Sequence, residues 1–349
     1  MKAIIEENVW LAELTTLKIG GKARFLASAT DEKQAVEALD FAVKNSLKVF
    51  ILGGGSNVLI ADEGFDGLVL QIALKGISVG ETPNEFIVTA DAGEDWDAFC
   101  QFCVGRNMPG VECLSGIPGL VGGSPVQNIG AYGQEVSETI SAVKVYDRFE
   151  NRIEVLSNAD CGFAYRTSIF NTSQANRYVV LAVTFTFGKG GEPKIAYKDL
   201  REFFGGNTPT LQDVRQAVLS IRAAKSMVIS ATDPNSKSAG SFFKNPIVSK
   251  EEYAEIEKRA EIAGIKSVPF YKIGNESVKI PAAWLIENSG FQKGFCRGNA
   301  GLSTRHTLAI INLGNAKAVE ILELKNEIQA KVKKIFGIEL HPEPIFVGF

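Results

Sequence analysis

The sequence has almost no histidine, little net charge and no long hydrophobic run. Among 349 residues there are two histidines, and 37 lysines and arginines nearly balance 40 aspartates and glutamates. This balance argues against nucleic acid or an anionic membrane as the main partner. No stretch approaches the roughly 18 apolar residues of a membrane span, and Glu6 and Glu7 interrupt the segment where a signal peptide would have its hydrophobic core. We therefore expect a cytoplasmic protein without membrane insertion.

Cysteine is also scarce, with five residues spread over the chain. An odd and dispersed number favours reduced thiols over a disulfide framework. Cys100 and Cys103 have the spacing of a metal-ligand pair, but no second pair follows, and both histidines, His306 and His341, lie far away in the sequence. A zinc or redox role for this pair is one interpretation; we favour the other, two buried positions of a helix.

Glycine is the residue in excess, at 34 of 349, and it is clustered. The first cluster runs from Gly53 to Asn57. It does not fit the dinucleotide-binding fingerprint, because the third glycine of that motif would fall at Val58 and the residues that follow are β-branched and apolar. The N–H groups of a glycine loop can still surround a phosphate. The simpler alternative is an ordinary hairpin turn.

The second cluster spans residues 109–133 and contains no lysine, arginine or histidine. Apolar side chains are spread through it, so it is not a flexible linker. A folded, uncharged segment rich in glycine offers backbone donors at close approach, which suits a flat or phosphorylated ligand. The alternative is a tightly packed structural loop.

The length predicts two or three domains. Periodicity predicts helices over 30–46, 95–105, 210–225, 249–263 and 315–336, and strands over 48–52, 58–60, 86–90, 140–149, 152–157 and 178–187. Interspersed helices and strands indicate an α+β fold. The polar stretch 232–238 predicts a linker, with a domain boundary near residue 225.

The two glycine segments, with 165–170, 240–246 and the pair Pro342 and Glu343, resemble the UDP-N-acetylenolpyruvoylglucosamine reductase (MurB) family of flavoproteins, in order and over nearly the whole chain. Residues 195–200 and the Tyr271 segment resemble the form with a mobile tyrosine loop. The resemblance implies an α+β fold with a two-part FAD-binding region of the vanillyl-alcohol-oxidase/PCMH type and a C-terminal α+β substrate domain. The expected parts are 1–75, 76–225 and 226–339, with a strand in 340–349 returning to the first.

The resemblance also implies a reaction. NADPH reduces FAD, and the flavin then reduces the enolpyruvyl ether of UDP-N-acetylglucosamine to the lactyl ether, in peptidoglycan precursor synthesis. Hydride addition leaves an enolate that the protein must stabilise and protonate. The matching residues are Arg166, whose guanidinium suits an enolised carboxylate, Glu343, flanked by two prolines, and Ser241, a weak acid that suffices for a strongly basic enolate.

The same resemblance assigns the binding residues. FAD contacts are expected at Gly53, Gly54, Gly55, Ser56, Asn57, Ser115, Gly116, Pro118, Gly119, Gly122, Gly123, Ser124, Gln127, Asn128, Gly130, Ala131 and Tyr132. Substrate contacts are expected at Tyr165, Tyr197, Lys225, Asn245 and Tyr271. Neither histidine lies in the glycine segments, so we expect FAD without a covalent bond, and we expect a monomer without a metal.

Two positions depart from the family pattern. Ile345 replaces an arginine expected two residues after Glu343, and Cys296 replaces a glutamine expected near the uridine. Two alternatives stay open: another FAD-dependent oxidoreductase of the vanillyl-alcohol-oxidase-like class, and a non-enzymatic nucleotide-sugar sensor on a retained fold.

Overall fold

The computed structural model describes residues 2–349, which form two compact units. The first consists of the chain up to Val9 with residues 23–55 and 65–228, and the second of residues 10–22, 56–64 and 229–349. Both units therefore combine segments that are distant in the sequence. The predicted division into 1–75, 76–225 and 226–339 stays a prediction.

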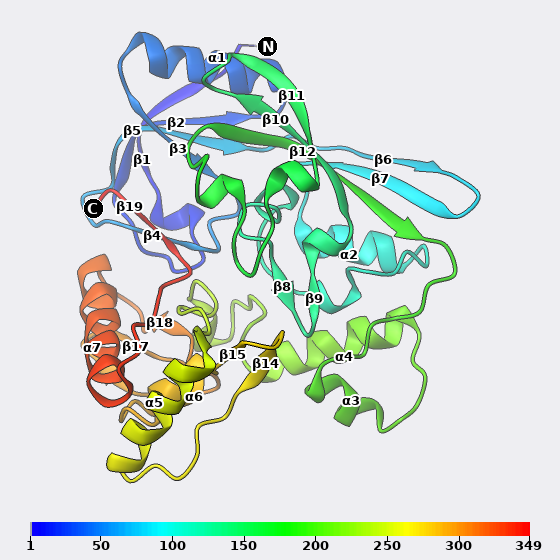
Figure 1. Ribbon diagram of the computed structural model, residues 1–349. Helices are drawn as coiled ribbons and strands as arrows, with labels where there is room; N and C mark the ends of the chain where they lie inside the picture. The colour runs from blue at the N-terminus through cyan, green and yellow to red at the C-terminus, as the bar shows by residue number, and fades with distance from the viewer. Residues whose placement is uncertain (1) are drawn as a thin grey trace. The chain divides into compact units, whose positions relative to one another are not determined.

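Two sheets make up most of the first unit (Figure 1). One has the order β1-β2-β5-β3, and in it β2 and β3 each pair in parallel with β5. The other is antiparallel, with the order β11-β10-β12-β7-β6. The strands are β1 (Ile5–Trp10), β2 (Lys22–Ala29), β3 (Lys48–Leu52), β5 (Phe65–Ile72), β6 (Ile77–Glu81), β7 (Glu85–Asp91), β10 (Ile140–Asp147), β11 (Arg152–Ser157) and β12 (Tyr178–Gly188), with a short pair of β8 (Gly130–Ala131) and β9 (Gln134–Glu135).

Four helices accompany these sheets: α1 (Glu32–Lys44), α2 (Trp96–Val104), α3 (Lys198–Phe204) and α4 (Leu211–Ala224). The side chain of Asp31 caps α1 by accepting from the N–H of Gln34, and Thr210 and Asp213 form a capping box at the start of α4. The core includes Trp96 and Phe99 of α2, which pack on Phe185 of β12.

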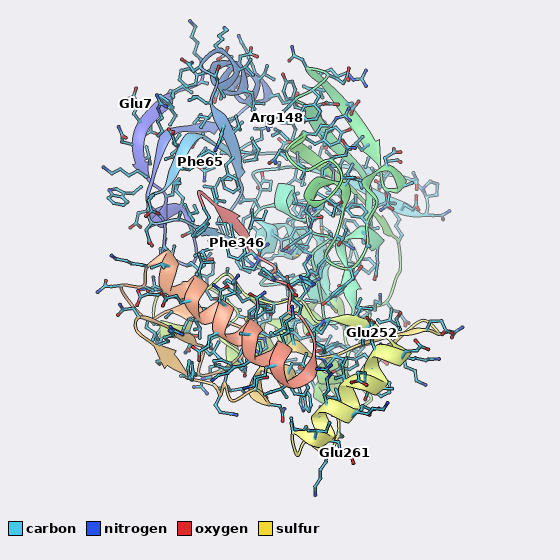
Figure 2. All side chains as sticks on the ribbon, turned by 60° about the vertical axis from the view of Figure 1, so that its left-hand side comes forward. Glu7, Phe65, Arg148, Glu252, Glu261 and Phe346 are labelled. Carbon is cyan, nitrogen blue, oxygen red and sulfur yellow. The ribbon has the colours of Figure 1, made fainter. Side chains whose placement is uncertain are left out.

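Short strands and three helices form the second unit. Its strands are β4 (Val58–Ile60), β13 (Ile247–Ser249), β14 (Tyr271–Ile273), β15 (Ser277–Lys279), β16 (Cys296–Arg297), β17 (Ala300–Leu302), β18 (Ile310–Asn312) and β19 (Ile345–Val347), and its helices are α5 (Lys250–Ile262), α6 (Ala282–Glu287) and α7 (Ala318–Phe336). Helix α7 packs against β17, β18, α5 and α6 (Figure 1). On α5, the exposed Glu252 and Glu261 lie near opposite ends of the helix (Figure 2), while Ile256 and Ala260 face the core.

The predicted helices and strands are present, and the predicted α+β fold is confirmed. The capping pair that predicts the start of the 249–263 helix is also found, since Ser249 accepts from the N–H of Glu252 and Glu252 accepts from the N–H of Ser249. Among the described residues, no helix has both the length and the apolar character needed to cross a membrane.

Two interpretations of the sequence are wrong. The segment from Gly53 to Asn57 is not a hairpin turn, because β3 pairs with β5 in one sheet and β4 pairs in parallel with β19 in another. The polar stretch 232–238 is not a free linker. Its residues Asn235 and Ser238 are buried in the second unit, where Asn235 Oδ1 accepts from the N–H of Thr304. Polar composition misleads here because the buried side chains of Asn235, Ser236 and Ser238 have hydrogen-bond partners inside the fold.

Candidate functional site

The two glycine segments contact each other. A Cβ placed on Gly54 would lie 2.8 Å from Cα of Gly119, so this approach of the two backbones requires glycine. Gly122 is equally restricted, since its Cβ would lie 2.5 Å from Cβ of Ala92. At Gly53 and Gly123 the opposite holds, because no described atom lies within 4 Å of an added Cβ. The glycines thus bring two loops together and also leave a backbone surface that a flat ligand can approach.

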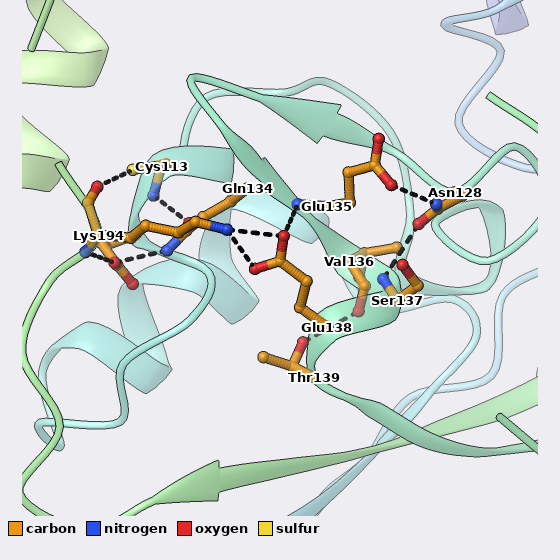
Figure 3. Close-up of polar contacts among 10 residues, drawn as sticks. Cys113, Asn128, Gln134, Glu135, Val136, Ser137, Glu138, Thr139 and Lys194 are labelled. Carbon is orange, nitrogen blue, oxygen red and sulfur yellow. Dashed lines mark hydrogen bonds and ion pairs between the residues drawn. The ribbon is translucent and has the colours of Figure 1, made fainter. Parts of the chain in front are cut away.

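Part of the second segment is held by a buried polar network (Figure 3). The carboxylate of Glu112, which has no exposed surface, accepts from Gln134 Nε2 at 2.6 Å, from the N–H of Gly110 at 2.6 Å and from the N–H of Lys194 at 3.1 Å. Gln134 Oε1 in turn accepts from the N–H of Cys113. The sequence analysis did not single out Glu112 and Gln134. The one indication in the sequence was that Glu112 is a carboxylate in a segment without basic residues.

Three of the predicted cofactor residues use their side chains inside this loop. The hydroxyls of Ser115 and Ser124 donate to the carbonyls of Glu112 and Val121. Asn128 donates to Glu135 and to the carbonyl of Ala164, and its amide oxygen accepts from the N–H of Ser137 (Figure 3). The hydrogen-bond donors of these three side chains are therefore used within the protein.

Helix α4 directs two arginines toward the start of the second segment. Arg215 forms a bidentate pair with Asp97 at 2.6 and 2.8 Å, and Asp97 also accepts from the N–H of Gly116 at 2.6 Å. Burial acts to raise the pKa of Asp97, but the hydrogen bonds from Arg215 and Gly116 outweigh it and leave that pKa below its usual value. This carboxylate therefore joins α2, α4 and the glycine segment.

The second of these arginines, Arg222, is buried and has an unsatisfied donor. Its Nε is the one buried side-chain polar atom that lacks a hydrogen-bond partner among the described residues, and it lies 3.3 Å from a Cβ built on Gly116. An unpaired buried donor is costly. A ligand that brings an acceptor to the Gly116 loop would satisfy it, and the donor set here suits an anionic or carbonyl-bearing group.

We expect Asp97→Asn to lower the free energy of unfolding by about 3 kcal/mol, because it leaves the buried Arg215 without its counter-charge. The side chain of Asp97 is 36% exposed, so we take the lower end of the range for buried pairs. A carboxyl group whose pKa is lower in the folded than in the unfolded protein stabilises the fold above its unfolded pKa. This stabilisation is lost as the pH falls through the folded pKa. The difference between the two proteins should therefore shrink below about pH 4.

Urea unfolding at pH 7 and at pH 3 measures this effect. Asp66→Asn is the matched control, because Asp66 forms an exposed pair with Arg24 and is 86% exposed. Equal losses of stability in the two variants would contradict a structural role for the Asp97 pair.

Three predicted binding residues form one cluster in the first unit. Lys225, at the C-cap of α4, lies with its Nζ 5.9 Å from the ring centre of Tyr132, and that ring meets Tyr197 edge to face at 5.5 Å. Lys225 Nζ also pairs with Asp199 at 2.8 Å. Burial raises the pKa of Tyr132 to about 12, so its hydroxyl stays protonated and can donate. Asp199 is a member of this cluster that sequence reasoning missed.

Arg166 lies beside the second glycine segment. Its guanidinium donates to the carbonyl of Gly130 at 2.7 Å and stacks over the ring of Tyr165 at 5.3 Å. The backbone of Arg166 has a φ of 53°, a left-handed conformation that is uncommon for a residue with a long side chain. Such local strain occurs where the surrounding structure holds a side chain in a required direction.

In the second unit the structure brings Ser241 and Glu343 onto adjacent segments. The N–H of Glu343 donates to the carbonyl of Phe242 at 2.9 Å, and Phe243 pairs with Pro342 in an antiparallel bridge. Phe242 and Phe243 are buried, and Phe242 packs on Phe346 (Figure 2 labels Phe346). Phe242, the residue after Ser241, is therefore hydrogen-bonded to the main chain of Glu343, which carries the predicted catalytic carboxyl group.

The other two predicted substrate residues differ in their surroundings. Asn245 Oδ1 accepts from the N–H of Ala282 at the start of α6. Tyr271 is 53% exposed on β14. Of the two departures from the family pattern, Ile345 is exposed at the start of β19 and Cys296 is exposed on β16.

The predicted burial of Cys100 and Cys103 in a helix is confirmed, since both lie in α2 without exposed surface. Burial raises the pKa of both thiols, so they stay protonated and are poor nucleophiles and poor metal ligands. No group of three or more potential metal ligands occurs within residues 2–349.

Comparison with known proteins identifies relatives over the full length of the chain. A family model for the C-terminal domain of UDP-N-acetylenolpyruvoylglucosamine reductase matches residues 233–347, and one for an FAD binding domain matches residues 23–151. The reductase of Thermobifida fusca is 45% identical, covering 100% of this chain and 99% of the relative. That of Streptomyces coelicolor is 41% identical, covering 97% and 89%. The crystal structure of the enzyme from Thermus caldophilus has a TM-score of 0.66 at 24% identity and covers 99% of both chains.

Proposed function

Since the chain belongs to the UDP-N-acetylenolpyruvoylglucosamine reductase family, we propose that Arg166, Ser241 and Glu343 stabilise and protonate the enolate of its reaction. The sequence resemblance to this family is confirmed. The protein is an FAD-dependent oxidoreductase that reduces UDP-N-acetylglucosamine enolpyruvate with NADPH in peptidoglycan precursor synthesis. The assignment of individual residues to this reaction is our proposal.

The described residues fit an FAD. When bound, FAD accepts hydride from NADPH and passes it to the substrate. We assign its binding to the two glycine segments, on the observation that Gly54 and Gly119 meet while Gly53 and Gly123 face open space. The buried Nε of Arg222, beside Gly116, supports the same assignment because FAD offers phosphate, hydroxyl and ring carbonyl oxygens as acceptors.

Arg166 is proposed to stabilise the negative charge that develops on the substrate. Hydride addition to the enol ether places charge on the α-carbon and on the neighbouring carboxylate. A guanidinium offers several N–H donors in a planar fork, and it stays charged at every relevant pH. The bond from Arg166 to the Gly130 carbonyl orients this fork next to the glycine segment. The charge of Arg166 would then stabilise the substrate carboxylate more strongly as that group gains charge in the transition state.

Ser241 and Glu343 are proposed to act as a pair. The observation that carries this proposal is the hydrogen bond from the N–H of Glu343 to the carbonyl next to Ser241. A hydroxyl is a weak acid, but an enolate is basic enough to take its proton when the two are held in contact. Glu343 would act through its carboxyl group, on a main chain that this hydrogen bond joins to the segment of Ser241.

For the diphosphate of the substrate we propose Lys225, Tyr197, Asn245 and Tyr271, and we propose that Tyr165 contacts the substrate near the flavin. Lys225 is the positively charged residue of this set, and its Nζ forms an ion pair with the carboxylate of Asp199 at 2.8 Å. Oxygen donors such as tyrosine hydroxyls and asparagine amides complement a lysine at a phosphate. We also propose that the protein is a cytoplasmic monomer, which light scattering of the purified protein tests by giving the mass of one chain.

We predict that FAD is bound without a covalent bond, because neither histidine lies in the glycine segments. Acid precipitation of the yellow protein should release all of its flavin into the supernatant, where the absorption spectrum measures it. A pellet that stays yellow would contradict the prediction. So would a protein that remains colourless after addition of FAD.

A further inference from the structure

We propose that Asn57 is a positioning residue for Glu343, in addition to its predicted FAD contact in the first glycine segment. The two residues are 286 positions apart in the sequence, and Asn57 Nδ2 donates to the carbonyl of Glu343 at 3.2 Å. The carbonyl of Asn57 accepts from the N–H of Ile345 at 3.0 Å. The last residue of the first glycine segment thus contacts the main chain on both sides of Pro344.

The sequence around Glu343 explains why this contact matters. Pro342 and Pro344 have no N–H, so Glu343 supplies the one backbone donor of the three residues. Pairing of β19 with β4 begins only at Ile345, opposite Val58. The side chain of Asn57 therefore provides the hydrogen bond that the strand pairing does not provide at Glu343.

Both polar groups of the Glu343 main chain are held as a result. Its N–H donates to Phe242, the residue after Ser241, and its carbonyl accepts from Asn57. The main chain of Glu343 is thereby hydrogen-bonded both to the residue after Ser241, the proposed proton donor, and to Asn57, the last residue of the first glycine segment. Misplacement of a catalytic group by about 1 Å can cost on the order of 10²-fold in rate. Loss of the hydrogen bond from Asn57 should therefore lower the rate of the substrate half-reaction.

This inference rests on the proposed role of Glu343, and its test uses Asn57→Asp in the full-length holoenzyme. The variant keeps the shape of the side chain but turns an oxygen instead of an N–H group toward the Glu343 carbonyl. We expect reoxidation of the reduced flavin by the enolpyruvyl substrate to slow by about 10- to 100-fold. Because Asn57 also belongs to the proposed FAD-binding segment, both half-reactions are measured on the flavin-bound fraction, and reduction of the flavin by NADPH should slow by a smaller factor than reoxidation. In steady state the loss should fall on kcat rather than KM.

A double-mutant cycle with Glu343→Gln separates this inference from the proposed function. If Asn57 acts through Glu343, Asn57→Asp should have little further effect in the Glu343→Gln protein. If Glu343→Gln alone leaves reoxidation unchanged, the proposed role of Glu343 is wrong. If Asn57→Asp slows the reaction equally in both backgrounds, the positioning role is wrong while the role of Glu343 stands.

Asn312→Asp is the matched control, because Asn312 Nδ2 likewise donates to a backbone carbonyl in the same unit, that of Leu17. Its melting temperature shows the cost of losing such a bond, and its half-reactions should stay normal. Equal slowing of both half-reactions in the flavin-bound Asn57→Asp protein would overturn the proposal and place Asn57 at the cofactor alone. Unchanged rates would also overturn it. If Asn57→Asp fails to fold, Asn57→Ala serves with the same criteria.

Discussion

Replacement of Ser241 by alanine should slow reoxidation of the reduced flavin by the enolpyruvyl substrate by about 10²- to 10⁴-fold, the usual cost of removing a general acid. The proton is needed only after hydride has reached the substrate. Reduction of the flavin by NADPH does not require it and should stay near normal. Stopped-flow absorbance measures the two half-reactions separately.

The structure makes this test selective. Phe242 and Phe243 are buried directly after Ser241, and the main chain of Phe242 is held by the N–H of Glu343. Removal of one hydroxyl at the half-buried position 241 leaves these contacts in place. Ser267→Ala, an exposed serine after α5 in the same unit, is the control and should change neither rate. Equal slowing of both half-reactions in Ser241→Ala would mean that the serine shapes the pocket and is not the acid.

Arg166→Lys should slow the same substrate half-reaction by about 10²- to 10³-fold, as expected for loss of a donor to a developing oxyanion. Lysine keeps the positive charge but lacks the planar fork that donates to two oxygens at once. Both residues have a Cβ, so the strain of the left-handed backbone, with φ of 53°, is unchanged by the substitution. The effect can therefore be attributed to the guanidinium.

The control is Arg106→Lys, because Arg106 is an exposed arginine that stacks over Phe102 in the same unit. It should retain both half-reactions. Flavin content and melting temperature should be normal in both variants. If Arg166→Lys raises KM while kcat is unchanged, the guanidinium contributes to substrate binding in general and not to the transition state.

Much of the secondary structure was predictable because its signals are local. The helical periodicity of α7 and the capping pair of Ser249 and Glu252 depend on residues within a few positions of one another. The short strands β13 to β18 of the second unit were missed, because two or three residues carry no recognisable alternation. Polarity also misled at Asn235 and Ser238, whose partners lie far along the chain.

For the site, the sequence by itself determined which residues are glycine, which carry charge, and to which family the chain belongs. Only the tertiary structure decided which of them meet. The parallel pairing of β4 with β19, the contact of Gly54 with Gly119, and the hydrogen bonds of Asn57 to Glu343 and of Lys225 to Asp199 join segments that no short-range pattern connects. The physical reason is that such contacts depend on which backbone groups and buried surfaces of distant segments remain to be paired once the local elements have formed.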